Sequence, residues 1–154
     1  MKRLSSIYFG ILGVIALAFG IADLLVTIGG SGLSFGILEI PCDAFRGGWG
    51  GLIILSAGLF YLAGIKNISE IHQISKVMMG SILIWIIAGL DIFAMITESI
   101  PGGDRSWFNT LEGFLETYAP PYAPAIFLLP FSLVVFYYIL KKERNILKKE
   151  KDEE

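Results

Sequence analysis

Four long apolar runs constrain this chain more than any other feature of its sequence. A helix that crosses the hydrocarbon core of a bilayer needs about 17–25 predominantly apolar residues, so each run is long enough, although the second is at the lower limit. None of them alternates between apolar and polar residues, so they predict helices rather than barrel strands. The predicted fold is an all-α, four-span transmembrane helical bundle. Its spans cover roughly residues 7–28, 49–65, 77–97 and 123–140.

The composition supports a single integral membrane domain over residues 1–154. Only 17% of the residues are charged, whereas soluble domains usually carry about 25%, and 55% are hydrophobic. This balance excludes an ordinary soluble enzyme, a disordered tail and a nucleic-acid-binding module. The expected partner is therefore the lipid bilayer, with no nucleic acid. The single cysteine, Cys42, excludes an internal disulfide framework.

The placement of basic residues predicts the orientation. Ten of the twelve Lys and Arg residues fall on one side of the predicted spans, many of them in the tail at residues 141–154. The positive-inside rule then places both termini in the cytoplasm, as in a multi-pass protein of the cell membrane. An alternative is that the first span is a cleaved signal peptide, because Ala16-Leu17-Ala18 resembles a cleavage site. The apolar run continues for ten residues beyond that triplet, as expected of an anchor.

The two predicted outer loops differ in character. The first, over residues 29–48, opens with a glycine-rich turn that has no core-forming potential. In the second, apolar residues over 107–118 recur at helical spacing. We expect a short amphipathic helix there on the outer membrane surface, or alternatively one packed on the end of the bundle. Pro130 is expected to kink the last span.

The two halves of the chain show a weak internal similarity. Residues 20–25 resemble residues 88–93, and each segment carries an aspartate and is followed by a glycine pair and a Leu-Glu pair. This pattern suggests two duplicated helical hairpins, an arrangement found among membrane transport proteins. Chance similarity between apolar helices is the alternative interpretation.

Small residues gather on one face of three of the spans. Small faces allow helix backbones to approach closely, which is how helices associate inside a membrane. Tight packing is therefore the expected role of these glycines, either within the chain or between copies. The positions are Gly10, Gly13 and Gly20 in the first span, Gly51 and Gly58 in the second, and Gly80 in the third.

Two intramembrane acids, Asp23 and Asp91, are the main functional candidates. At 1.5 Å per residue both lie roughly 6–8 Å outward of the bilayer centre, at nearly the same depth. Such residues usually face the bundle interior and mark ion or proton pathways. Glu98 lies on the same side of the third span as Asp91, and Arg46 lies beside the entry to the second span. The alternative is a structural role in which one or both aspartates pair with Arg46.

No other constellation in the sequence indicates chemistry. The predicted topology places His72 across the membrane from Cys42, and no cofactor or metal motif is present. We therefore expect a non-enzymatic protein without a cofactor. The leading hypothesis is a homo-oligomer or a subunit of a larger membrane complex. The alternative is a small proton- or cation-coupled transporter or channel subunit that uses Asp23 and Asp91.

Overall fold

The structure is a computed structural model that describes residues 2–66, 70–98, 119–141 and 144. Within this part, four helical stretches are long and apolar enough to cross a membrane, which confirms the prediction of a helical bundle. The predicted helix at 107–118 and most of the basic tail lie outside the described residues. The elements are α1 (Lys2–Gly29), a π-helical segment η1 (Ala44–Trp49) that leads directly into α2 (Gly50–Gly64), α3 (Ile71–Glu98) and α5 (Pro124–Ser132).

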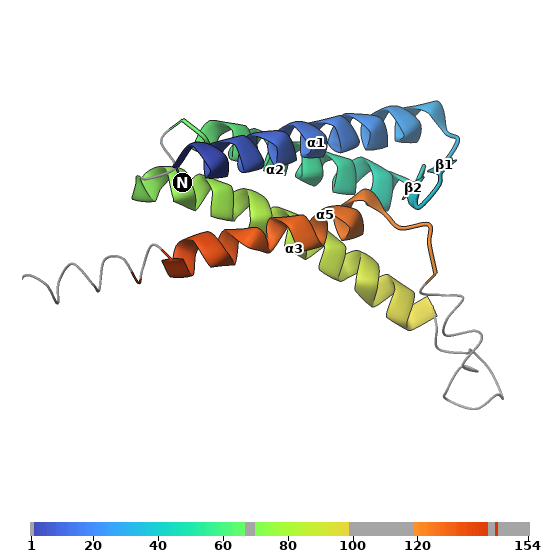
Figure 1. The fold of residues 1–154 in the computed structure, drawn as a ribbon. Helices are drawn as coiled ribbons and strands as arrows, with labels where there is room; N and C mark the ends of the chain where they lie inside the picture. The colour runs from blue at the N-terminus through green and yellow to red at the C-terminus, as the bar shows by residue number, and fades with distance from the viewer. Residues whose placement is uncertain (1, 67–69, 99–118, 142–143, 145–154) are drawn as a thin grey trace, which may run out of the picture.

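The helices pack in chain order (Figure 1). α2 lies between α1 and α3, and α5 packs mainly against α3 and only slightly against α1. The core between them is apolar and aromatic: the rings of Phe9 and Tyr61 stack with centroids 5.9 Å apart, and Ile84 and Leu128 are fully buried beside them. One polar pair lies within this core, where the Tyr61 and Ser81 hydroxyls are 2.7 Å apart.

A β-hairpin closes the end of the bundle at which α1 ends and α2 begins, and we call this end the hairpin end (Figure 1). Strand β1 (Leu33–Phe35) pairs antiparallel with β2 (Leu38–Ile40) around a turn in which Gly36 has a φ of 61°. Tyr122 extends the hairpin: its N–H donates to the Ile37 carbonyl, and its carbonyl accepts from the Glu39 N–H. The glycine-rich turn expected after the first span is therefore followed by a small sheet, which was not among the predicted elements.

The last span is interrupted after Pro130, where a kink was expected. Helix α5 ends at Ser132, Leu133 forms a turn, and residues 134–141 are helical again. Side chains of two other helices bind the interrupted segment. The Tyr8 hydroxyl of α1 donates to the Phe131 carbonyl at 2.9 Å, and Trp85 Nε1 of α3 donates to Ser132 Oγ at 2.7 Å.

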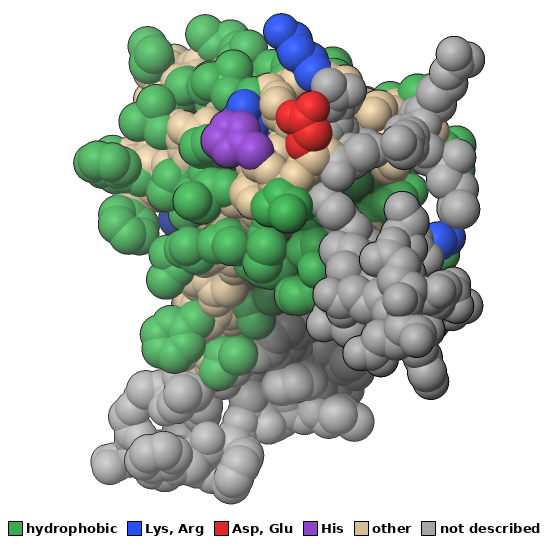
Figure 2. All heavy atoms as spheres, turned by 90° about the vertical axis from the view of Figure 1, so that its left-hand side faces the viewer, with side chains coloured by type: hydrophobic (Ala, Val, Ile, Leu, Met, Phe, Trp, Pro, Cys, Tyr) green, Lys and Arg blue, Asp and Glu red, His purple; other side chains and the backbone are tan. Residues whose placement is uncertain are grey.

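The end opposite the hairpin carries charged side chains. Figure 2 looks onto this end and shows Lys or Arg, Asp or Glu and histidine side chains together, surrounded by hydrophobic side chains that cover the sides of the bundle. A polar end with apolar sides is the distribution that a membrane-spanning bundle requires. The suggested duplication of the two hairpins stays a prediction, because the segment joining α3 to the last span, 99–118, lies outside the described residues.

Candidate functional site

Three charged residues from three different elements meet near the hairpin end of the bundle. Asp23 lies two turns before the end of α1, Arg46 lies in η1, and Asp91 lies two turns before the end of α3. Arg46 Nε is 3.4 Å from Asp91 Oδ1, which is a long, hydrogen-bonded ion pair. The charge of Asp91 also acts on Asp23, so the two carboxylates are electrostatic neighbours. We call these three residues the acid cluster.

Local sequence explains how Arg46 reaches this position. Asp43 precedes η1, and its Oδ1 accepts the N–H of Phe45 at 3.0 Å and that of Arg46 at 2.6 Å, as an N-cap does. The Gly48 N–H then bonds the Asp43 carbonyl five residues back, the spacing of a π-helix. This wider first turn is built from Gly47 and Gly48, and it leads into α2 without a break. Short π-helical turns inside helices occur frequently at functional sites.

Burial increases from Arg46 to Asp23. The Arg46 side chain is 39% exposed and that of Asp91 is 9% exposed. Asp23 as a whole is 1% exposed, and among the described residues its Oδ1 is the one buried side-chain oxygen or nitrogen without a hydrogen-bond partner. The cluster therefore has an accessible cationic edge and a buried acidic interior, where Asp23 Oδ1 has no hydrogen-bond partner among the described residues.

The formal charges of the acid cluster do not cancel. With all three groups ionised, the cluster contains two carboxylates and one guanidinium, and their charges sum to one negative charge. Asp43 also acts on Asp91, but Asp43 is exposed, so water screens its charge. An excess charge in a region of low dielectric is strongly unfavourable. One bound proton or one monovalent cation would make the cluster neutral.

Close backbone contacts hold Asp23 inside the bundle. A Cβ atom built on Gly51 would lie 2.7 Å from Asp23 Cβ, so α2 can approach α1 here only because residue 51 is glycine. One turn further along α1, Thr27 Oγ1 donates to the Asp23 carbonyl at 2.8 Å and lies against the position of a Cβ on Gly47. η1 and α2 thus cover Asp23 with backbone rather than with side chains that could hydrogen-bond it.

The predicted packing glycines lie mainly between helices of this same chain. A Cβ on Gly20 would lie 2.6 Å from the Leu55 nitrogen, and one on Gly58 would lie 2.8 Å from the Leu17 nitrogen. Gly10 is the exception, since the nearest atom to its Cβ position is Ile65 Cδ1 at 3.7 Å. Gly13 meets Tyr61 and Leu62, Gly51 meets Asp23, and Gly80 meets the Ala57 carbonyl.

Two further glycines, Gly64 and Gly47, make close contacts of the same kind. A Cβ on Gly64 would lie 2.9 Å from the Gln73 carbonyl where α2 meets α3, and Gly47 fits against Thr27 and Pro41. The glycine-rich composition around the second span was the signal for both. Glu98, a fourth candidate for the ion pathway, is the last residue of α3, and its side chain lies outside the described part of the structure.

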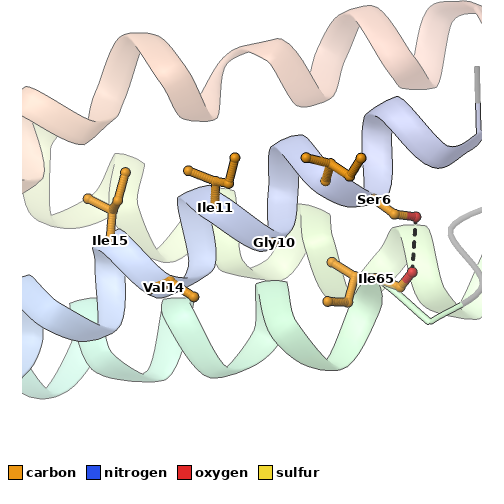
Figure 3. A pocket seen from close by; sticks show the side chains of 7 residues that line it. Ser6, Gly10, Ile11, Val14, Ile15 and Ile65 are labelled. Atoms are coloured by element: carbon orange, nitrogen blue, oxygen red, sulfur yellow. Dashed lines mark hydrogen bonds between the residues drawn. The ribbon is translucent and has the colours of Figure 1, made fainter.

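Two cavities in the described part of the chain are apolar, and no residue of the acid cluster lines either of them. A hollow of about 520 Å³ along α1, shown in Figure 3, is lined by aliphatic side chains, and its polar group, Ser6 Oγ, already donates to the Ile65 carbonyl. A second cavity of about 290 Å³ between α1 and α5 is lined by residues such as Ile11 and Phe127. Within the described ranges, no three His, Cys, Asp or Glu residues are grouped so that they could hold a metal ion.

Comparison with protein families, with curated proteins and with solved structures finds no match to this chain.

Proposed function

We propose that this chain is a small, non-enzymatic membrane protein that binds a proton or a monovalent cation at the acid cluster, as a coupled transporter or channel subunit. The observation that carries the proposal is the buried, unpaired Asp23 carboxylate beside the Asp91–Arg46 pair. Intramembrane carboxylates that lack a full set of partners are typical of ion and proton pathways.

The electrostatic arrangement supports binding from the hairpin end. Arg46 is the most exposed member of the cluster and Asp23 the least, so a ligand that arrives from that end meets the ion pair first. A proton or cation that replaces Arg46 beside Asp91 would release the guanidinium toward water. The orientation expected from the positive-inside rule places this end outside the cell.

Reconstitution into vesicles tests the proposal. We expect the wild-type protein to mediate flux of protons or of a monovalent cation under an imposed gradient, and Asp23→Asn and Asp91→Asn each to abolish it. Glu39→Gln is the matched control, because Glu39 is an exposed acid of the hairpin outside the cluster. Flux equal to wild type in the double variant Asp23→Asn, Asp91→Asn would refute the proposal.

Assembly with other copies or with other membrane subunits is a second candidate function. The observation that favours it is the low burial of the spans: within their most apolar stretches, 28% of α1, of α3 and of the last span is buried. The glycines give this proposal less support than expected, because most of them already pack against other helices of the same chain. Mass measurement after extraction in a gentle detergent tests it, and a monomer without partners at every protein concentration would contradict it.

A further inference from the structure

The β-hairpin has one apolar and one polar face. The register pairs Leu33 with Ile40 and Phe35 with Leu38, whereas Ser34 pairs with Glu39 between them. Because side chains of directly paired residues lie on the same face and successive residues alternate, four apolar side chains share one face and the two polar ones share the other. The hairpin is therefore amphipathic, although each strand has only three residues.

The bundle covers only the β2 half of the apolar face. β2 lies against α1 and α5, and its Ile40 is 9% exposed. On the same face, β1 remains uncovered, with Leu33 52% exposed and Phe35 80% exposed. The apolar face of the hairpin thus has two parts: the β2 part packs against the bundle, and the β1 part projects past the edge of the bundle.

Other exposed apolar side chains lie at the hairpin end, as the uncovered half does. Ile28 at the end of α1 is 83% exposed, and Phe45 and Trp49 of η1 are 70% and 64% exposed. Aromatic side chains at the ends of spans are typical of membrane–water interfaces. Over residues 28–40 the one charged side chain is Glu39, which lies on the opposite face of the hairpin.

The free edge of the hairpin sets its depth. Tyr122 pairs with the β2 edge, so β1 is the open edge within the described part of the chain. An open edge cannot enter the hydrocarbon core, because its backbone N–H and C=O groups need partners. At the interface, water and lipid headgroups can supply these partners while the apolar side chains reach the acyl chains.

We infer that the hairpin is a membrane-contacting element that lies in the interface of the bilayer leaflet at the hairpin end, with Leu33 and Phe35 in contact with lipid and Ser34 and Glu39 facing water. The inference requires that the four helices span a membrane, and it is independent of any ligand at the acid cluster. Its partner is a lipid surface rather than a second protein, since the uncovered face lies at the same end of the bundle as the exposed apolar residues where α1 ends and η1 leads into α2.

Nitroxide labels on adjacent residues of β1 test this inference. In a Cys42→Ser background, which removes the single native cysteine, a label is attached to Phe35→Cys or, as the matched control, to Ser34→Cys on the opposite face. The proteins are reconstituted into phosphatidylcholine vesicles, and collisions are measured with oxygen, which concentrates in lipid, and with a water-soluble nickel chelate. We expect the oxygen-to-nickel collision ratio to be severalfold higher at position 35 than at position 34.

A second labelled site makes the result decisive. Leu33→Cys should give the same lipid signature as Phe35→Cys, so the test does not depend on one variant. Equal ratios at positions 34 and 35 would place both faces in water and overturn the inference. Low collision rates with both reagents at position 35 would show that protein covers this face, and this result would also overturn the inference.

Discussion

At the scale of single residues, the two aspartates of the acid cluster have different environments. Asp91 has Arg46 Nε at 3.4 Å, whereas Asp23 Oδ1 has no hydrogen-bond partner among the described residues. Arg46 is the cation that pairs with Asp91 in the acid cluster, and it makes no ion pair or hydrogen bond with Asp23. Loss of Arg46 should therefore leave the largely buried Asp91 carboxylate unpaired.

Arg46→Gln should lower the free energy of unfolding. Breaking a buried ion pair costs about 3–5 kcal/mol and breaking an exposed one about 0–1 kcal/mol. Because Arg46 is 39% exposed and Asp91 is 9% exposed, we expect an intermediate loss of about 1–3 kcal/mol. Unfolding of the purified protein in mixed micelles, followed by circular dichroism, measures this. Lys66→Gln, at an exposed position near the opposite end, is the control, and equal losses in both variants would contradict the prediction.

Glycine contacts lead to a second prediction at this scale. A methyl group at position 20 would collide with the backbone of Leu55, which cannot move away as a side chain can. Gly20→Ala should therefore destabilise the protein by about 1–3 kcal/mol, as overpacking does. The same unfolding measurement applies.

Gly89→Ala is the matched control for Gly20→Ala. Gly89 also lies inside a helix, but nothing lies within 4 Å of its Cβ position. Replacing a helical glycine with alanine without a clash stabilises by roughly 0.5–1 kcal/mol. The two substitutions should thus have opposite signs, and a loss of stability in both would show that the contact at Gly20 is not the cause.

At the scale of elements, the helices were predictable and the connections were not. Continuous apolar runs identify the spans, and Pro130 indicates the interruption of the last one, which the structure places at Leu133. The helices exceed the predicted spans at their polar ends: α1 begins at Lys2 and α3 at Ile71. Hydropathy locates the hydrocarbon-crossing part of a helix, but it does not detect polar turns that extend the helix beyond it.

The hairpin and η1 depend on features that single-residue patterns do not show. Residues 33–40 contain only two short alternating segments, too few to distinguish a hairpin from a loop, and β2 is completed by Tyr122, which is distant in sequence. The contact between Arg46 and Asp91 was anticipated as one alternative, because both residues were expected near the same end. The burial of Asp23 beneath Gly51 was not, since it depends on the distance between two backbones.

The interruption of α5 yields a prediction at this scale. Tyr8 of α1 donates a hydrogen bond to the Phe131 carbonyl, next to the turn at Leu133. Tyr8→Phe should cost about 0.5–1.5 kcal/mol of unfolding free energy, toward the lower end if the carbonyl finds another donor. Tyr137→Phe is the control, because the Tyr137 hydroxyl contacts only the exposed Lys141 side chain among its described partners. Equal effects of the two substitutions would argue against a role for Tyr8 in holding α5.

At the scale of the whole molecule, the two ends of the bundle differ. One end carries the hairpin and the acid cluster, and the other exposes charged and histidine side chains between the ends of the helices (Figure 2). The excess of Lys and Arg on that second side predicts that it faces the cytoplasm. The structure itself does not depend on which side of the membrane each end faces.

Reporter fusions test the orientation. A fluorescent protein that folds only in the cytoplasm should be bright when fused to either terminus. A phosphatase that is active only outside should be active when fused after residue 36, in the turn of the hairpin. Fluorescence from a fusion at one terminus, together with phosphatase activity from a fusion at the other terminus, would contradict an even number of crossings.

The two hydrogen bonds that join Tyr122 to the hairpin involve backbone atoms alone. Substitutions at positions 37 and 39 should therefore be broadly tolerated, except that proline at 39 would remove a donor. Insertions are different, because one extra residue between 119 and 122 would shift the pairing between two segments that are more than 80 positions apart in the chain. The connections at the hairpin end should thus accept changes of side chain freely and changes of length poorly, which a deep mutational scan with single-residue insertions would reveal.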